Sequence, residues 1–183
     1  MQILQTLAQM LEQPGAERVT TAALAARLEV SEAALYRHFA SKAQMFEGLI
    51  EFIEQSVFSL VGQIAERETE GEMQVRRVLT VLLQFAEKNP GMTRVMVGDA
   101  LVFENERLVA RMNQFFERFE SQLRQSLRGS AEAAGSATPT VDASAQASVL
   151  TSFAIGRLQR FARTGFRKSP TENLDVALRL FAF

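Results

Sequence analysis

The side chains best suited to binding a polyanion lie in one short stretch of the chain, residues 19–42. This stretch holds the only His and the only Tyr among 183 residues, interleaved with hydroxyl groups and cations. Threonine hydroxyls at a helix N-terminus, a phenol and an ammonium group are suitable donors to phosphate oxygens. The polar side chains in question are Thr20, Thr21, Ser31, Tyr36, Arg37, His38 and Lys42. Their types allow hydrogen bonding to a nucleic acid rather than catalysis.

The rest of the composition argues against an enzyme. With one His and no Cys, the chain cannot form a multi-histidine metal site, a thiolate zinc site, a cysteine nucleophile or a disulfide. It has no glycine-rich phosphate loop, and its carboxylates fall on predicted helix surfaces. We therefore expect no catalytic residues, no cofactor and no metal. Because no secretory signal and no apolar run of about 20 residues is visible, we also expect a cytoplasmic protein without a membrane span.

Two short helices must position the polar side chains. Thr20 or Thr21 can cap the start of a helix that reaches about Leu28, and Ser31 can cap a helix that reaches Phe39. Two helices joined by so short a turn form a helix-turn-helix. Its expected core is Leu24, Ala25, Leu28, Val30, Leu35 and Phe39. The exposed side of the second helix, where a DNA reader enters the major groove, would carry Ser31, Ala33, Ala34, Arg37 and His38. A small helical subdomain without a ligand is the alternative.

Nearly every other segment also has helical periodicity. Apolar residues from Phe46 to Ile64 recur at intervals of three and four, which predicts one long helix with a buried face. We predict an all-α fold of about nine helices, with a DNA-binding domain over residues 1–45 and a dimerisation and partner-binding domain over residues 46–183. The stretch GSAEAAGSATPTVD, residues 129–142, is small, polar and turn-prone, which predicts a mobile loop.

The first stretch also resembles a known family. The run T-x-x-x-L-A-x-x-x-x-V-S-x-x-A-L-Y-R-H-F-x-S-K, from Thr20 to Lys42, is similar to the DNA-binding signature of TetR-type transcription factors. One departure is Glu29, because that family usually has Gly in the turn. The resemblance implies phosphate contacts by Thr20, Thr21, Tyr36, His38 and Lys42. It places Ser31, Ala33, Ala34 and Arg37 against the bases, with Arg37 as the main base reader unless it too contacts a phosphate.

Further segments resemble one branch of that family, the nucleoid occlusion factors. They are SEAALYRHFASK, MFEGLIEFIE, FAEKNPGMTRVM, ALVFENERL, MNQFFERFESQLRQ and RFARTGFRKSPTE. This resemblance implies a nucleoid-associated homodimer that binds palindromic double-stranded DNA and the C-terminal tail of the division protein FtsZ, and so antagonises FtsZ ring assembly. It also implies a groove for that tail at Phe52, Lys88 and Asn89. Two alternatives stay open: Phe52 could be core, and Lys88-Asn89 could be a plain helix end.

In dimers of the TetR type, the last two long helices of one chain pack against the same two helices of the partner chain. The apolar residues expected at that interface are Val149, Leu150, Phe153, Leu158, Ala177, Leu178 and Phe181. A second reading of the body is a ligand-sensing repressor of the TetR type with an apolar small-molecule pocket. Its lining would be Phe85, Met92, Met96, Phe103 and Met112, although such residues at helical spacing are more often core.

The charge of the first domain is unusual for a DNA-binding protein. Residues 1–47 hold four basic and five acidic side chains, a net charge of 4 − 5 = −1. Because phosphate neutralisation supplies most non-specific affinity, we expect weak DNA binding at physiological salt. Proteins of the resembling branch begin with a basic segment before the first helix, whereas this chain begins almost inside that helix. We therefore expect that Met1 is not the native start.

Overall fold

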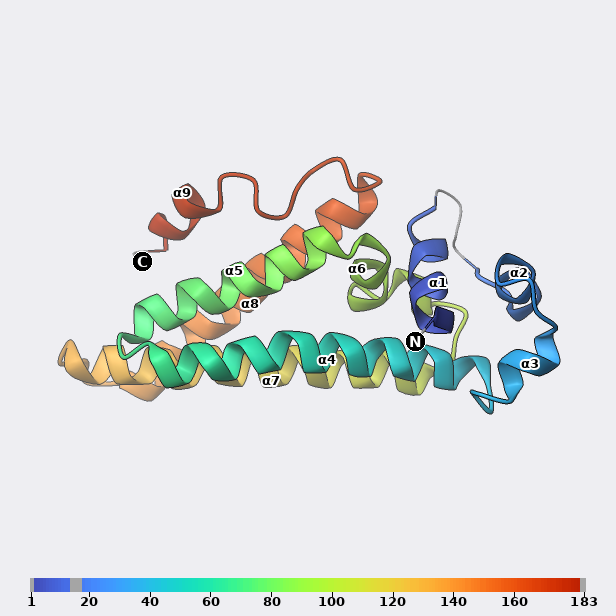
Figure 1. Cartoon of the computed structure of the whole chain (residues 1–183). Coiled ribbons are helices and arrows are strands. Elements are labelled where there is room, and N and C mark those ends of the chain that lie inside the picture. Colours follow the sequence, from blue (N-terminus) through green and yellow to red (C-terminus); the bar gives the residue numbers. More distant parts are fainter. Residues whose placement is uncertain (1, 14–17, 182–183) are drawn as a thin grey trace.

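The prediction of an all-α fold is confirmed. The computed structural model describes residues 2–13 and 18–181, and within them all regular structure is helical (Figure 1). The expectation about Met1 lies outside the described residues. The elements are α1 (Gln2–Leu11), α2 (Thr21–Arg27), α3 (Glu32–Tyr36), α4 (Lys42–Arg67), α5 (Gly71–Lys88), α6 (Pro90–Met96), a 3-10 turn η1 (Asp99–Leu101), α7 (Glu106–Ala133), α8 (Pro139–Arg163) and α9 (Leu174–Arg179).

Helices α1, α2 and α3 form a small head at one end of the molecule. Side-chain caps define its two short helices: Thr20 Oγ1 accepts from the Ala23 amide at 3.1 Å, and Ser31 Oγ accepts from the Ala34 amide at 3.2 Å. Leu24, Ala25 and Leu35 are buried as expected. Val30 differs from the prediction, because its side chain is 44% exposed and contributes little to the head core.

The long helices build the body. Most of the predicted stripe of α4 is buried against α5 and α7, although Leu60 is 45% exposed. Helix α5 also packs on α8. Helices α7 and α8 run antiparallel along each other, and Figure 1 shows α9 beyond α5, at the far end from the head. The core side of α8 consists of Ala143, Ala147, Leu150, Ala154, Leu158 and Phe161.

A tight joint connects head and body, and we call it the α1–α6 joint. It consists of Ala8 and Leu11 on α1 with Gly91 and Arg94 on α6. A Cβ atom added to Gly91 would lie 2.0 Å from the carbonyl oxygen of Ala8, so only glycine fits there. Arg94 Nη1 donates to the carbonyl of Leu11 at 3.3 Å, and Arg94 Nε donates to Asp99 Oδ2 at 3.0 Å.

The prediction of a loop over residues 129–142 is wrong in its extent. Helix α7 continues to Ala133 and α8 begins at Pro139, which leaves only residues 134–138 between them. Local interactions explain the difference. Arg128 and Glu132 pair at 3.3 Å in the i,i+4 arrangement, and proline is well tolerated at the first position of a helix. Most of the small and polar residues that suggested a loop are therefore helical.

Candidate nucleic-acid interface

The exposed side of α3 carries most of the predicted base-reading residues. Ser31, Ala33 and Arg37 are exposed, whereas Ala34 is half-buried. Next to them Tyr36 is 45% exposed and His38 is exposed. The short helix begins at the Ser31 cap, so its surface is held in a defined orientation beside α2. The contacts of these side chains with DNA remain a prediction.

The two threonines differ in their freedom to bind a phosphate. Thr20 is exposed, and its oxygen accepts the capping bond, so the hydroxyl hydrogen can still be donated. Thr21 Oγ1 already donates to Glu32 Oε2 at 2.6 Å, a bond that ties α2 to α3. A phosphate contact by Thr21 would have to displace Glu32. The sequence contained no signal for this bond, because the two residues belong to different helices.

Lys42 is also engaged in this structure. Its Nζ forms an ion pair and hydrogen bond with Glu104 Oε1 and lies 5.7 Å from the centroid of the Phe46 ring. The Lys42 side chain is 24% exposed and the Glu104 side chain 9%. The predicted phosphate donor at the start of α4 is therefore held by a carboxylate from the body, 62 positions further along the chain.

Glu29 adopts a backbone conformation that favours glycine. Its φ angle is 57°, in the left-handed region that costs a residue with a Cβ atom about 1–2 kcal/mol. This explains why a glycine is usual at this point of the turn. It also places an exposed carboxylate between α2 and α3, where it adds to the negative charge of the head.

The predicted groove residues lie between α4 and α5. Phe52 is 48% exposed and its ring centroid is 6.5 Å from that of Phe85, so Phe52 is a surface residue and not core. Lys88 is exposed, and no ion pair to it is found among the described residues. Asn89 is half-buried and ends α5, since its Nδ2 donates to the carbonyl of Phe85 at 2.7 Å. Asn89 thus stabilises the end of α5, whereas the side chains of Phe52 and Lys88 are exposed and could contact a partner.

Three of the residues predicted at the dimer interface are core residues of the single chain. Leu150, Leu158 and Leu178 are at most 1% exposed. Leu150 and Leu158 belong to the apolar stripe of α8, which packs on α7 and α5 within the chain, and Leu178 is a buried residue of α9. Phe153 and Phe181 pair with each other at 5.1 Å, and Ala177 is half-buried. Only Val149, which is 53% exposed, is clearly on the surface. The three leucines are covered within the chain, and a place at a dimer interface stays a prediction for Val149, Phe153, Ala177 and Phe181.

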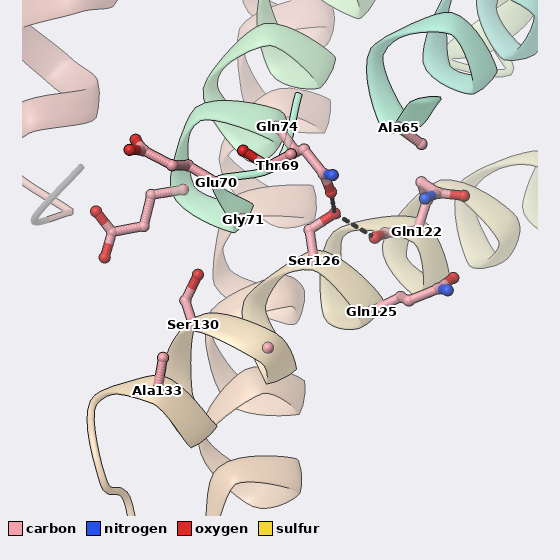
Figure 2. Close-up of a pocket in the computed structure, with 12 residues that line it drawn as sticks. Ala65, Thr69, Glu70, Gly71, Gln74, Gln122, Gln125, Ser126, Ser130 and Ala133 are labelled. Carbon is pink, nitrogen blue, oxygen red and sulfur yellow. Dashed lines mark hydrogen bonds between the residues drawn. The ribbon is translucent and has the colours of Figure 1, made fainter. Parts of the chain in front are cut away.

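The five residues proposed to line an apolar ligand pocket do not surround one cavity. Met96 and Met112 are buried in the core, whereas Phe103 is 64% exposed. A hollow of about 710 Å³ lies elsewhere, between the end of α4, the start of α5 and α7. Figure 2 shows that its walls are mostly Gln, Ser, Glu and small residues, with Ser126 Oγ donating to Gln74 Oε1 at 2.6 Å. Small-molecule pockets are predominantly apolar, so the structure gives the ligand-sensing reading no support.

Two other kinds of feature are absent from the residues that the structure describes. No group of three or more His, Asp or Glu side chains that could hold a metal ion occurs there. None of the helices described is both long enough and apolar enough to cross a membrane.

Two family models match the chain. Residues 3–49 match the model for bacterial regulatory proteins of the tetR family, and residues 70–183 match the model described as a tetracyclin repressor-like C-terminal domain of the SlmA-like type. Among solved structures, PfmR, a TetR family transcriptional regulator from Thermus thermophilus, is similar with a TM-score of 0.80 at 20% identity, covering 99% of this chain and 97% of that chain. The regulator FadR from Bacillus subtilis, solved with stearoyl-CoA, has a TM-score of 0.76 at 12% identity, over 99% and 96% of the two chains. At these identities the likeness concerns the fold.

Sequence relatives are much closer. The nucleoid occlusion factor SlmA of Photobacterium profundum is 53% identical over 175 residues, which is 95% of this chain and 89% of the relative. SlmA of Aliivibrio fischeri is 54% identical over the same shares of the two chains, and SlmA of Vibrio cholerae is 53% identical. The chain therefore belongs to the SlmA nucleoid occlusion factors, a branch of the TetR family of DNA-binding regulators.

Proposed function

We propose that the protein acts as a nucleoid occlusion factor, which binds palindromic chromosomal sites as a dimer and inhibits FtsZ ring assembly over the nucleoid. It would work in the cytoplasm, on the nucleoid, as a regulator and not as an enzyme. The observation that carries the proposal is the exposed, capped face of α3, in a chain 53% identical to SlmA over 95% of its length.

DNA recognition would divide between two kinds of contact. Arg37 is the exposed cation at the end of α3 that can make a bidentate contact with a guanine. Thr20, Tyr36 and His38 surround that face with groups that suit phosphates and carry no sequence information. Because residues 1–47 have a net charge of −1, we expect affinity to depend on a few well-placed contacts and to fall less steeply with salt than that of a strongly basic head.

Two substitutions test this division. Arg37→Ala should reduce discrimination between the palindromic site and a scrambled site by about 1–3 kcal/mol, because it removes a base contact. Thr20→Ala should weaken binding to both sequences alike, since it removes a phosphate donor together with the α2 cap. Fluorescence anisotropy with both DNAs, at two salt concentrations, measures the effects. Equal losses on both DNAs in the Arg37→Ala protein would exclude base reading by that residue.

The dimer interface would lie on the outer side of the α7–α8 pair. A hollow of about 400 Å³ there is lined by Asn113, Phe116, Glu117, Glu120, Arg124, Thr151, Ser152 and Ile155. Phe116 and Ile155 are half-buried at this hollow. A second copy packed on this face would fill the hollow and cover their apolar side chains.

Light scattering at micromolar protein tests the interface. We expect twice the chain mass of 20.4 kDa for the natural sequence, and the mass of one chain for Ser152→Arg, which places a charged side chain in the interface. Ser59→Arg, the same change at an exposed serine of α4, should leave the dimer intact. A single-chain mass for the natural sequence, or a dimer of Ser152→Arg, would contradict the interface.

The FtsZ tail would bind between α4 and α5. The exposed ring of Phe52, beside the half-buried ring of Phe85, offers an apolar contact, and the exposed Lys88 offers a cation at the end of α5. An extended acidic peptide fits this combination, because its apolar side chains and its carboxylates would meet matching groups.

A further inference from the structure

The ion pair between Lys42 and Glu104 connects the end of the DNA-binding head with the body of the molecule. Lys42 is the first residue of α4, directly after Ser41, whose Oγ accepts from the Gln44 amide at 3.2 Å. Glu104 lies in the segment between η1 and α7, and its amide donates to the carbonyl of Leu101 at 2.9 Å. The carboxylate is 9% exposed, so it is nearly withdrawn from solvent while it holds the Lys42 ammonium.

A DNA phosphate and this carboxylate would compete for the same ammonium group. The N-terminus of a long helix and a lysine at its first position together attract an anion. A phosphate that approached Lys42 would also approach the negative charge of Glu104, which repels it. The repulsion between the phosphate and the Glu104 carboxylate is strong because both would lie beside the protein interior, whose dielectric constant is lower than that of water.

We propose that Glu104 is a positioning residue for DNA binding: it withholds Lys42 from phosphate, and DNA binding breaks the Lys42–Glu104 pair. This inference rests on the proposed DNA-binding function. Affinity would thus be set partly from the body, because Glu104 follows η1, the turn that contains Asp99, which is the partner of Arg94 in the α1–α6 joint. Because the Lys42–Glu104 pair and DNA binding are coupled, a change in the body that strengthens the pair also weakens DNA binding.

The decisive experiment compares Glu104→Gln with a matched control. Glutamine keeps the size and the acceptor oxygen but removes the charge. Glu47→Gln removes one charge from a nearby carboxylate on α4 that pairs with Arg107 at 2.8 Å and not with Lys42. Kd for the palindromic DNA is measured by anisotropy between about 50 and 200 mM salt, a range over which phosphate contacts change affinity strongly, with melting curves for each protein.

We expect Glu104→Gln to bind the DNA several-fold more tightly than the natural protein at low salt. The slope of log K against log salt should stay nearly the same, because Lys42 contacts the phosphate in both DNA complexes and only the natural protein must first break the Lys42–Glu104 pair. Glu47→Gln should show a smaller gain in affinity. In a protein that already carries Lys42→Ala, Glu104→Gln should increase the affinity for DNA by no more than Glu47→Gln does.

Hydrogen exchange supplies an independent readout. In the natural protein, DNA should speed exchange of the Glu104 amide and its neighbours, because the pair that anchors the segment is broken. In Glu104→Gln the same amides should exchange fast without DNA. Unchanged affinity in Glu104→Gln, or slower exchange on DNA in the natural protein, would overturn the proposal while DNA binding itself stands. Absence of DNA binding by every variant would overturn the proposed function as well.

Discussion

Replacing Gly91 with alanine is expected to destabilise the protein by about 1–3 kcal/mol or more, as overpacking of a tight contact does. The new methyl group would lie 2.0 Å from the backbone oxygen of Ala8, and a backbone atom in a helix cannot rotate away. Either α6 or α1 must therefore shift, which opens the α1–α6 joint. For a domain of this size the melting temperature should fall by about 2–12 °C.

The matched control for this change is Gly62→Ala. Gly62 is an exposed helical glycine of α4, and no heavy atom lies within 4 Å of the Cβ position. There alanine should leave stability unchanged or raise it by about 0.5–1 kcal/mol, because it has the higher helix propensity. Calorimetry of the two variants separates steric conflict from a general effect of the added methyl. Equal melting temperatures for Gly91→Ala and the natural protein would show that the joint is not tight.

Phe52→Ser is expected to abolish most of the binding of an FtsZ tail peptide, while fold and DNA affinity remain. An aromatic anchor in a peptide groove commonly contributes about 2 kcal/mol or more, which is roughly 30-fold in Kd. Because Phe52 is already 48% exposed, the loss of stability should be well below the roughly 3–5 kcal/mol of a fully buried phenylalanine. Lys88→Glu should also weaken peptide binding, and this loss should shrink at high salt, because repulsion replaces attraction.

Two substitutions of the same types serve as controls for the groove. Phe103→Ser removes another exposed ring, which is 64% exposed and lies outside the groove, and Lys168→Glu reverses an exposed charge beyond α8. Anisotropy of a labelled tail peptide is measured with DNA bound. If Phe52→Ser and Lys88→Glu bind the peptide as well as the two controls do, the groove between α4 and α5 is not the site. If the natural protein binds no peptide on DNA, the FtsZ part of the proposal fails.

The head could be predicted from sequence because it depends on neighbours in the chain. Thr20 and Ser31 cap helices through bonds to amides three positions away, and such bonds follow from residue type and spacing. The exposed face of α3 then follows from periodicity. The same local reasoning failed for residues 129–142, because it counted glycine and serine as breakers. Helix α7 instead continues through them to Ala133, with the Arg128–Glu132 pair on its surface, and α8 begins at Pro139.

The features that could not be predicted depend on long-range contacts. Lys42 meets Glu104 across 62 positions, and nothing in either local pattern indicates that the two residues pair. The apolar residues of α8 could be identified as a buried stripe, but periodicity does not say whether such a stripe packs within the chain or against a second copy. Phe52 lies off the main stripe of α4, and the exposure of its ring depends on which other residues pack beside it in the fold, which the sequence pattern does not indicate.

As a nucleoid occlusion factor, the protein should mark the nucleoid through many DNA sites rather than control one promoter. A map of its binding sites on the chromosome, by crosslinking and sequencing in the cells that make it, tests this directly. The Arg37→Ala protein is the control for sequence-specific occupancy. We predict many palindromic sites dispersed over the chromosome, lost or blurred in the control. A single occupied site beside a neighbouring promoter would contradict the claim and favour a ligand-sensing repressor.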